Sequence, residues 1–204
     1  MKRSDHLRIG ILGGTFDPVH AGHLYIAEAA KRAFRLSQVR LMPAGTSPFK
    51  QGQRTASFSD RLEMVRLAVQ DRAGLYPCGF EGAKGAVSYT VETLTAFARL
   101  YPEDEFWFIL GDDAYQEFQL WREPERILRL ARLIVVTRPG YQEKPRFPEA
   151  LAELAAGRVQ HLELPGMDIS STRIRGQLEA GEDPGNVLLP AVKDYIARRG
   201  LYHA

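Results

Sequence analysis

Short apolar runs alternate with segments of helical periodicity along most of the chain, and this alternation limits the possible folds more than any other feature. Runs of four to eight apolar residues indicate strands that are buried on both faces. We predict such strands at residues 7–12, 39–43, 105–110 and 132–137, with a less regular one at 159–164. The pattern predicts βαβ units with right-handed crossovers. The predicted fold class is therefore α/β, a Rossmann-like doubly wound parallel sheet with helices on both faces.

Helical spacing connects these strands and continues to the end of the chain. Apolar residues recur every three or four positions within 24–34, 62–69 and 91–97. From Ser170 onward we predict a helix in "STRIRGQLEAG", a turn in "DPGNVLLP" and a last helix ending at Gly200. The sequence thus predicts a single domain over residues 1–204, with a C-terminal helical part at about 170–204.

Composition favours a cytoplasmic protein. The chain has 204 residues, and its lone Cys78 cannot form an internal disulfide. The apolar run after the basic N-terminus is too short for a signal peptide or a membrane span. The 27 Lys and Arg residues nearly balance the 25 Asp and Glu residues, and the charges are interspersed. We therefore expect no nucleic-acid or membrane partner, while a small anionic ligand fits the net charge of +2.

The stretch "GGTFDPVHAGHL", which begins at Gly13, follows the first predicted strand directly. Gly13 and Gly14 let the backbone approach a ligand, and the N-terminus of the helix after them favours an anion. Asp17 and Pro18 would fix the turn in between. A glycine pair after a strand is usually only a turn, but the whole combination is hard to explain by packing. We predict that a phosphate group binds here.

Two histidines stand three residues apart in the same stretch. His20 and His23 can present their rings on one face of the first helical turn, where two donors would stabilise charge on a phosphate. A metal site is disfavoured because no third ligand lies nearby in the sequence and Cys78 is isolated. We therefore predict no metal held by protein ligands. The dinucleotide-binding GxGxxG pattern and the Walker A loop are both absent.

A second motif, "ISSTRIR", begins at Ile169. Its hydroxyl residues Ser170, Ser171 and Thr172 suit a helix N-cap, and Arg173 and Arg175 follow in the first turns. An ordinary capped helix with exposed arginines and a second phosphate site explain these residues equally well. The presence of the first motif favours the phosphate site.

Together, "TFDPVHAGH" and "ISSTRIR" resemble the two signatures of the nucleotidylyltransferase superfamily. Further segments resemble its bacterial nicotinate-nucleotide adenylyltransferase branch, in the same order and over nearly the whole chain. They are "SPFK", "SYT", "LGDDA", "LWRE", "VTRPG" and the ending "GLY". The resemblance implies adenylyl transfer from ATP to nicotinate mononucleotide, which yields nicotinate adenine dinucleotide and pyrophosphate in NAD biosynthesis. It also implies Mg²⁺, bound mainly through the ATP phosphates.

The resemblance implies roles for particular residues. Catalytic roles fall to His20, His23, Lys50 and Arg175. The residues implied in ATP binding are Gly13, Gly14, Thr15, Phe16, His20, His23, Gly111, Asp113, Ser170, Ser171, Thr172 and Arg175. Those implied in binding nicotinate mononucleotide are Asp17, Lys50, Ser88, Tyr89, Thr90, Trp121 and Arg138, with the Trp121 indole stacked on the pyridine ring.

Three positions depart from the branch. Phe49 stands where a histidine is common, Val87 replaces a proline before "SYT", and Asp112 replaces a neutral residue. Phe49 cannot donate a hydrogen bond to phosphate. These departures bear on substrate affinity more than on the class of reaction.

Two other interpretations remain. A phosphopantetheine adenylyltransferase-like or cytidylyltransferase-like enzyme would share both phosphate motifs, but "SYT", the tryptophan and "RPG" argue against it. A non-catalytic nucleotide-binding regulatory module would have no need to retain His20, His23, Lys50 and Arg175 together. Whether the chain forms a homo-oligomer is left open by the sequence.

Overall fold

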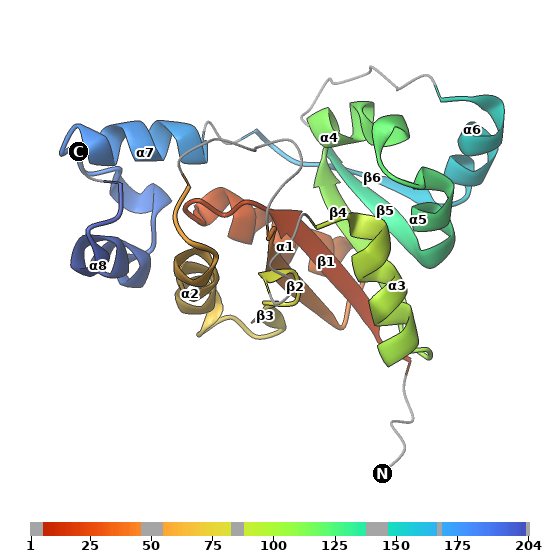
Figure 1. Ribbon diagram of the computed structural model, residues 1–204, viewed down its shortest axis with the longest axis horizontal. Coiled ribbons are helices and arrows are strands. Elements are labelled where there is room, and N and C mark those ends of the chain that lie inside the picture. The colour runs from red at the N-terminus through yellow and green to blue at the C-terminus, as the bar shows by residue number, and fades with distance from the viewer. Residues whose placement is uncertain (1–5, 46–54, 83–87, 138–146, 167–168, 203–204) are drawn as a thin grey trace, which may run out of the picture.

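The described part of the chain contains a parallel sheet with the strand order β3-β2-β1-β4-β5-β6 (Figure 1). The computed structural model describes residues 6–45, 55–82, 88–137, 147–166 and 169–202. The strands are β1 (Arg8–Gly14), β2 (Gln38–Pro43), β3 (Leu75–Pro77), β4 (Glu105–Gly111), β5 (Ala131–Thr137) and β6 (Val159–Glu163). This is the strand order of the doubly wound Rossmann-like sheet, so the predicted fold class is confirmed.

The central strand β1 lies between β2 and β4. Ile11 faces Arg40 on one side and Phe108 on the other. From β1 the chain runs outward through β2 to β3 and then crosses back to β4, so the direction of winding reverses between β1 and β4. In sheets of this kind the ligand crevice lies at the carboxyl ends of the two strands beside that reversal. Here these ends are Gly14 and Gly111.

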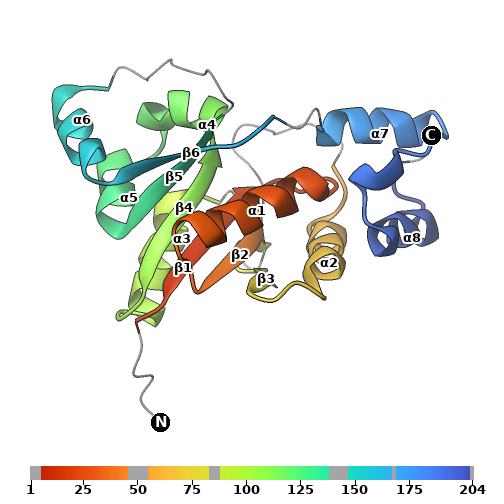
Figure 2. The ribbon, with the colours of Figure 1, turned by 180° about the vertical axis from the view of Figure 1, so that it is seen from behind.

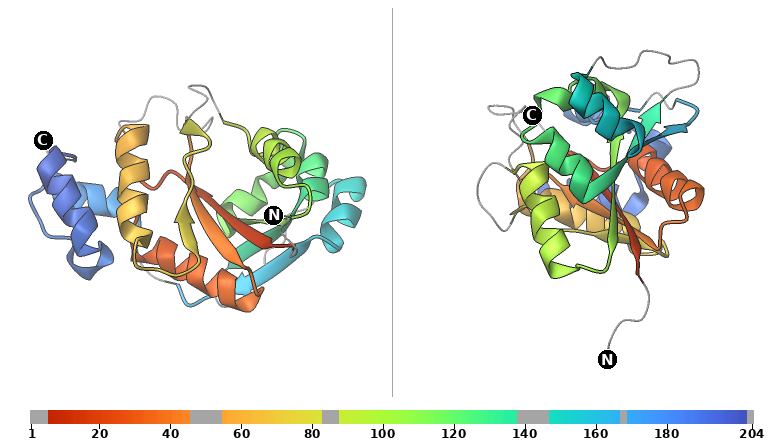
Figure 3. Two further views of the ribbon diagram at one scale, coloured as in Figure 1. Left: turned by 90° about the horizontal axis from the view of Figure 1, so that it is seen from below. Right: turned by 90° about the vertical axis from the view of Figure 1, so that its right-hand side faces the viewer.

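Helices cover both faces of the sheet because side chains alternate along each strand. Leu12 and Ile109 point to one face, while Ile11 and Phe108 point to the other, and all four are buried. The first face packs against α1 (Ala21–Ala33) and α2 (Phe58–Val69). The second packs against α3 (Thr90–Leu100), α5 (Pro124–Leu130) and α6 (Glu149–Ala156). Figure 2 shows α1 in front of the strands, and the right panel of Figure 3 shows α1 and α3 on opposite sides of them.

The C-terminal segment is helical, as the sequence predicts, and lies beside α2 (Figure 1). It consists of α7 (Ser171–Glu179), the short 3₁₀ helix η3 (Gly185–Val187) and α8 (Pro190–Arg199). Gly200 ends α8 with a φ of 60°, a left-handed conformation that favours glycine. The α8 residues Val192 and Ile196 are buried in the same core cluster as α1 and α2.

A buried carboxylate joins α8 to α2. Asp60 accepts hydrogen bonds from Tyr195 Oη at 2.8 Å and from Arg199 Nε at 3.1 Å. Burial opposes ionisation of Asp60, but hydrogen bonds from Ser57, Tyr195 and Arg199 outweigh it, so the pKa of Asp60 is lowered. The ionised carboxylate therefore holds α8 against α2.

Some elements were not predicted. Strand β3 has only three residues, too few for a visible alternation of side chains. The elements α4 (Asp112–Gln116) and η2 (Phe118–Leu120) are each a turn or two long, and α5 and α6 have seven and eight residues. Such short helices are formed by tertiary packing rather than by a sustained periodic pattern.

Candidate active site

Strand β1 ends in two glycines whose neighbours leave little room for a side chain. A Cβ on Gly13 would lie 3.0 Å from the Phe108 ring, and one on Gly14 would lie 3.1 Å from the Phe16 ring. Phe16 is buried and has a φ of 52°, a left-handed conformation that costs a non-glycine residue on the order of 1–3 kcal/mol. The Asp17–Pro18 peptide bond is cis. The positive φ of Phe16 and the close packing around the two glycines define a specific conformation of this segment, and such conformations cluster at functional sites.

His20 and His23 lie together at the start of α1, as predicted. Their rings stack with centroids 3.7 Å apart and an interplanar angle of 25°. The backbone N–H of His20, the N-cap residue, donates to Nδ1 of His23 at 3.2 Å. A neutral His23 with an occupied Nδ1 acceptor carries its proton on Nε2 and can donate it to an anion. The two imidazoles therefore form one unit at a helix N-terminus.

Burial changes the charge of one member of this pair. His20 is 6% exposed, and desolvation lowers its pKa from 6.5 to about 4. His20 is therefore neutral at pH 7 in the unliganded protein. Its Nδ1 has no hydrogen-bond partner among the described residues. A buried polar nitrogen without a partner is costly in a folded protein, and a bound ligand would offset that cost.

The two sequence motifs meet in space although more than 150 positions separate them. Ser171 Oγ, at the start of α7, donates to the carbonyl of Pro18 at 3.1 Å. Arg175 Nη1 donates to the carbonyl of Asp17 at 2.7 Å. Ser170 caps α7 by accepting from the N–H of Arg173. The N-termini of α1 and α7 therefore belong to one site, and both favour anions.

Asp17 is an anchor rather than a lining residue. Its side chain is 1% exposed, and its Oδ1 accepts from the N–H of Ala56 at 3.0 Å and from Tyr202 Oη at 2.6 Å. Arg175 Nη1 lies 3.8 Å from its Oδ2. Asp17 does not line the neighbouring cavity. In the described part of the chain this carboxylate therefore connects the phosphate loop with the entry to α2 and with the C-terminal segment.

A cavity of about 640 Å³ opens at the carboxyl ends of β1 and β4. It brings together Gly13, Gly14 and Thr15 with Ser88, Tyr89, Thr90, Gly111 and Trp121, all of which were candidate site residues. Ser88 is 8% exposed, and within the described residues its Oγ has no hydrogen-bond partner. A buried, unpaired hydroxyl on the wall of a cavity is suited to a polar ligand.

Aromatic rings form one wall of this cavity. Trp121 packs edge-on against Phe108, with centroids 6.0 Å apart, and also contacts Phe118 at 5.5 Å. Trp121 is only partly buried, so part of its indole remains accessible. Arg122 lies over the Tyr89 ring at 4.8 Å and is also part of the cavity lining. A planar ligand ring and an anionic group would both find partners here.

Gly111 differs from the glycines of β1. A Cβ at Gly111 would meet no protein atom within 4 Å, and the residue lines the cavity. Protein packing therefore does not explain a glycine here, whereas the close approach of a ligand would.

Asp113 follows in the first turn of α4, is exposed and does not line the cavity. His20, His23, Ser170, Ser171, Thr172 and Arg175 also lie outside the cavity lining, beside the loop after β1.

Several predicted positions fall outside the described residues. These are Lys50 and Arg138 from the candidate site and the departures Phe49 and Val87. Conversely, Arg61 and Glu81 contact the loops of the site but were not predicted. Arg61 is buried in the same helix as Met64, Val65 and Ala68, at spacings of three, four and seven. A charged residue at such spacings, on an apolar helical stripe, is the signal that could have revealed it.

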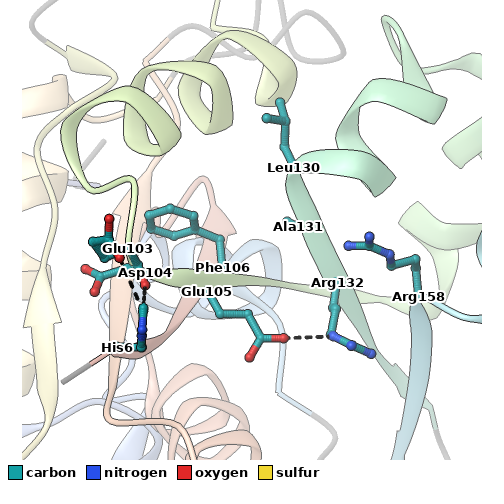
Figure 4. Close-up of a pocket in the computed structure, with 9 residues that line it drawn as sticks. All are labelled: His6, Glu103, Asp104, Glu105, Phe106, Leu130, Ala131, Arg132 and Arg158. Carbon is teal, nitrogen blue, oxygen red and sulfur yellow. Dashed lines mark hydrogen bonds and ion pairs between the residues drawn. The ribbon is translucent and has the colours of Figure 1, made fainter.

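A second, smaller cavity of about 320 Å³ lies at the opposite ends of the strands (Figure 4). Its lining includes Glu105 at the start of β4 and Ala131 and Arg132 at the start of β5. Figure 4 shows Arg132 paired with Glu105, at 2.8 Å, and His6 paired with Glu103. No residue of either sequence motif reaches this hollow.

The described residues contain neither a candidate metal cluster nor a helix that could span a membrane. No group of three or more His, Cys, Asp or Glu side chains there could hold a metal ion. None of the described helices is long and apolar enough to cross a membrane.

The fold and the site together are typical of a nucleotidyltransferase. They combine the doubly wound sheet with the stacked histidines at the start of α1 and with the "ISSTRIR" helix joined to them. Residues 11–177 match the cytidylyltransferase-like family, and the chain belongs to that family.

Similar proteins narrow the assignment. The chain is 42% identical to a protein of Desulfitobacterium hafniense strain DCB-2 named "probable nicotinate-nucleotide adenylyltransferase", with 96% of this chain and 95% of that protein covered. It is 38% identical to a protein of the same name from Shewanella sp. strain MR-4, over 96% and 99% of the two chains. This chain therefore belongs to the nicotinate-nucleotide adenylyltransferase family.

Solved structures share the fold. The nicotinic acid mononucleotide adenylyltransferase of Plasmodium falciparum superimposes with a TM-score of 0.76 at 20% sequence identity, over 97% of this chain and 98% of that one. That protein has been solved in complex with APC and in complex with NaAD.

Proposed function

We propose that the protein transfers the adenylyl group of ATP to nicotinate mononucleotide, giving nicotinate adenine dinucleotide and pyrophosphate in NAD biosynthesis. The observation that carries the proposal is the junction of the two motifs, in which Ser171 and Arg175 bond to the carbonyls of Pro18 and Asp17. This junction brings two helix N-termini together beside a cavity with an aromatic wall, and helix N-termini favour anions. The family to which the chain belongs performs this type of transfer.

The reaction needs alignment more than proton transfer. A phosphate oxygen of nicotinate mononucleotide, ionised at neutral pH, attacks the α-phosphorus of ATP. A new P–O bond forms as the bond from the α-phosphorus to the bridging oxygen breaks, and pyrophosphate leaves with the electron pair. No general base is required, so catalysis rests on positioning and on stabilisation of the charge on the phosphates.

The chain's own groups fit these tasks. His20 and His23 would donate to the ATP phosphates, with Arg175 and Lys50 as cationic partners of the same phosphates. Gly13, Gly14, Thr15 and Phe16 would pass close to the phosphates through their backbone, and Gly111 and Asp113 would hold the ribose. Ser170, Ser171 and Thr172 would close on the adenine and triphosphate. Mg²⁺ would enter as part of the ATP substrate, held mainly by phosphate oxygens.

The nicotinate half would bind in the 640 Å³ cavity. Trp121 would stack on the pyridine ring, and Ser88, Tyr89 and Thr90 would face the ring and its carboxylate from the start of α3. Arg138 would add a cationic contact. We also propose that the chain forms one domain, because residues of α7 and α8 pack into the core cluster of α1 and α2.

The test is an end-point assay on purified protein. ATP and Mg²⁺ are mixed with nicotinate mononucleotide, and pyrophosphate and dinucleotide are quantified together. Parallel reactions replace the acceptor by nicotinamide mononucleotide or phosphopantetheine, or replace ATP by CTP. Equal amounts of pyrophosphate and nicotinate adenine dinucleotide are expected. Nucleotide binding without pyrophosphate release would instead indicate a regulatory module, and turnover only with phosphopantetheine or CTP would indicate a sister enzyme.

A further inference from the structure

Arg61, in the first turn of α2, uses all three of its side-chain nitrogens to bond to three backbone carbonyls, which belong to two loops. Nη1 donates to the carbonyl of Thr15 at 2.8 Å, Nη2 to the carbonyl of Gly45 at 3.0 Å and Nε to the carbonyl of Ala56 at 3.2 Å. Its side chain is 4% exposed. The loop after β1 and the two described ends of the connection between β2 and α2 therefore meet at one buried guanidinium.

Two carboxylates accept hydrogen bonds from the N–H groups of two of the same residues. The N–H of Gly45 donates to Glu81 Oε2 at 3.4 Å, and the N–H of Ala56 donates to Asp17 Oδ1 at 3.0 Å. Glu81 and Asp17 are both buried. Buried charged side chains therefore hydrogen-bond to both the N–H and the C=O of Gly45 and of Ala56. A residue whose N–H and C=O are both bonded to fixed side chains loses most of its freedom to shift.

A buried arginine is not explained by packing alone. Burial lowers the pKa of Arg61, and the nearby Asp17 and Tyr202 act in the opposite direction. An apolar residue would avoid this desolvation cost on a helical stripe that also carries Met64 and Val65. The planar guanidinium, however, can reach three carbonyls in fixed directions, which the point-like ammonium of lysine cannot. The arrangement therefore favours alignment of the loops over simple stability.

We infer that Arg61 is a positioning residue of the transfer reaction, which sets the Thr15 peptide of the phosphate loop relative to the Gly45 and Ala56 peptides. The inference rests on the proposed function. Thr15 lines the cavity and lies between the packed glycines and the histidine pair, so its displacement would move the groups that align the phosphates. Arg61 itself acts through the backbone, without a contact to the reacting atoms.

The deciding variant is Arg61→Lys, with Arg199→Lys as the matched control. Arg199 also bonds to α2, but it comes from α8 and its partner is the Asp60 side chain rather than a loop carbonyl. Because misplacement of reacting groups by about 1 Å can cost about 100-fold, we expect Arg61→Lys to lower kcat by about 10-fold or more. Arg199→Lys should stay within about twofold of the wild type, since its contact is partly solvent-exposed.

A second measurement separates alignment from loss of folded protein. Amide hydrogen exchange should accelerate in peptides that contain Gly45 or Ala56, while β4 keeps its protection. Assays at several temperatures well below the melting transition should give the same fold-loss in kcat. If Arg61→Lys is folded and retains kcat within about twofold, or if exchange near Gly45 and Ala56 is unchanged, the inference is wrong.

Two further outcomes also decide the matter. If the loss of kcat in Arg61→Lys follows the unfolded fraction as temperature rises, or if both Arg61→Lys and Arg61→Gln fail to fold, Arg61 serves stability and the inference is overturned. If the wild-type protein forms no dinucleotide from ATP and nicotinate mononucleotide, the proposed function fails and the catalytic part of the inference fails with it. Hydrogen exchange then still reports whether Arg61 anchors the loops.

Discussion

Tyr202 donates a hydrogen bond from Oη to Oδ1 of Asp17, at 2.6 Å, across 185 positions of sequence. Burial raises the pKa of Tyr202, and the bond to Asp17 raises it further, so the phenol stays protonated and remains a donor. The same Asp17 oxygen accepts from Ala56. The end of the C-terminal segment is therefore attached to the phosphate loop through one buried carboxylate.

Removal of this hydroxyl should weaken the fold. Tyr202→Phe leaves a buried carboxylate oxygen with one donor fewer, and we expect a loss of about 1–3 kcal/mol in the free energy of unfolding. Urea unfolding of the wild type and the variant measures this loss of free energy. Tyr76→Phe is the matched control, because Tyr76 of β3 is 50% exposed. Equal stability of the two variants would mean that the Tyr202 bond contributes nothing.

The histidine pair should matter for turnover. His20→Ala or His23→Ala removes a group that meets charge developing on the phosphates, so kcat should fall by about 100-fold or more, as on loss of an oxyanion donor. His6→Ala, at the exposed opposite end of the sheet, controls for the loss of an imidazole elsewhere. Folded His20→Ala or His23→Ala protein with nearly normal kcat would refute the assigned role.

The pKa of His20 also predicts a dependence of stability on pH. In the unfolded chain this imidazole takes up a proton near pH 6.5, whereas in the folded protein it does so only near pH 4. Between these values the unfolded state binds more protons, so stability falls as pH is lowered from about 6.5 to about 4. The shift from 6.5 to about 4 corresponds to a total loss of up to ~3 kcal/mol.

This pH effect can be isolated by comparison of wild type with His20→Asn. Urea unfolding at pH 7 and pH 5, without nucleotide, gives the change in stability for each protein. The wild type should lose more stability than the variant over this interval, because only the wild type carries the buried imidazole. Identical pH dependence in both proteins would show that His20 titrates normally in the folded state.

The sequence predicts much of the central sheet because five of its strands are short apolar runs between helical patterns. The ends of these strands differ from the predicted ones by only one or two residues, as at Gly13 and Gly14 of β1. It predicts β3 and α4 poorly, since three or five residues cannot display a period. Local pattern is therefore informative only where an element is long enough to repeat it.

The candidate site divides in the same way. The resemblance of short motifs identifies candidate residues such as His20 and Trp121, whose proposed roles depend on their own side chains. It does not distinguish a ligand contact from an anchor, and Asp17 is the example, since its partners Ala56 and Tyr202 are distant in sequence. Arg61 was missed for the same reason, because its role consists of three tertiary contacts to backbone carbonyls.

Stacking on Trp121 should separate the two substrates. Trp121→Ala should weaken nicotinate mononucleotide binding by about 1–3 kcal/mol, which is the range for loss of ring stacking on a base, and should leave ATP binding nearly unchanged. Trp121→Phe keeps a stacking surface and should recover part of the loss. Calorimetric titration with each ligand measures both. Equal losses for the two ligands would indicate that Trp121 is structural, through its contacts with Phe108 and Phe118.

The departure at Phe49 allows a test of the neighbouring cation, although both positions lie outside the described residues. If Lys50 alone supplies a contact that the family usually shares with a histidine, Lys50→Ala should cost on the order of 2 kcal/mol in kcat/KM, because a charged hydrogen bond is lost. Phe49→His in the Lys50→Ala background should then recover part of the loss, since a donor one residue away can reach the same anion. Values of kcat/KM for the wild type, both single variants and the double variant test this expectation. Additive effects within error would mean that the two positions do not share a phosphate group, because groups that contact one anion are coupled.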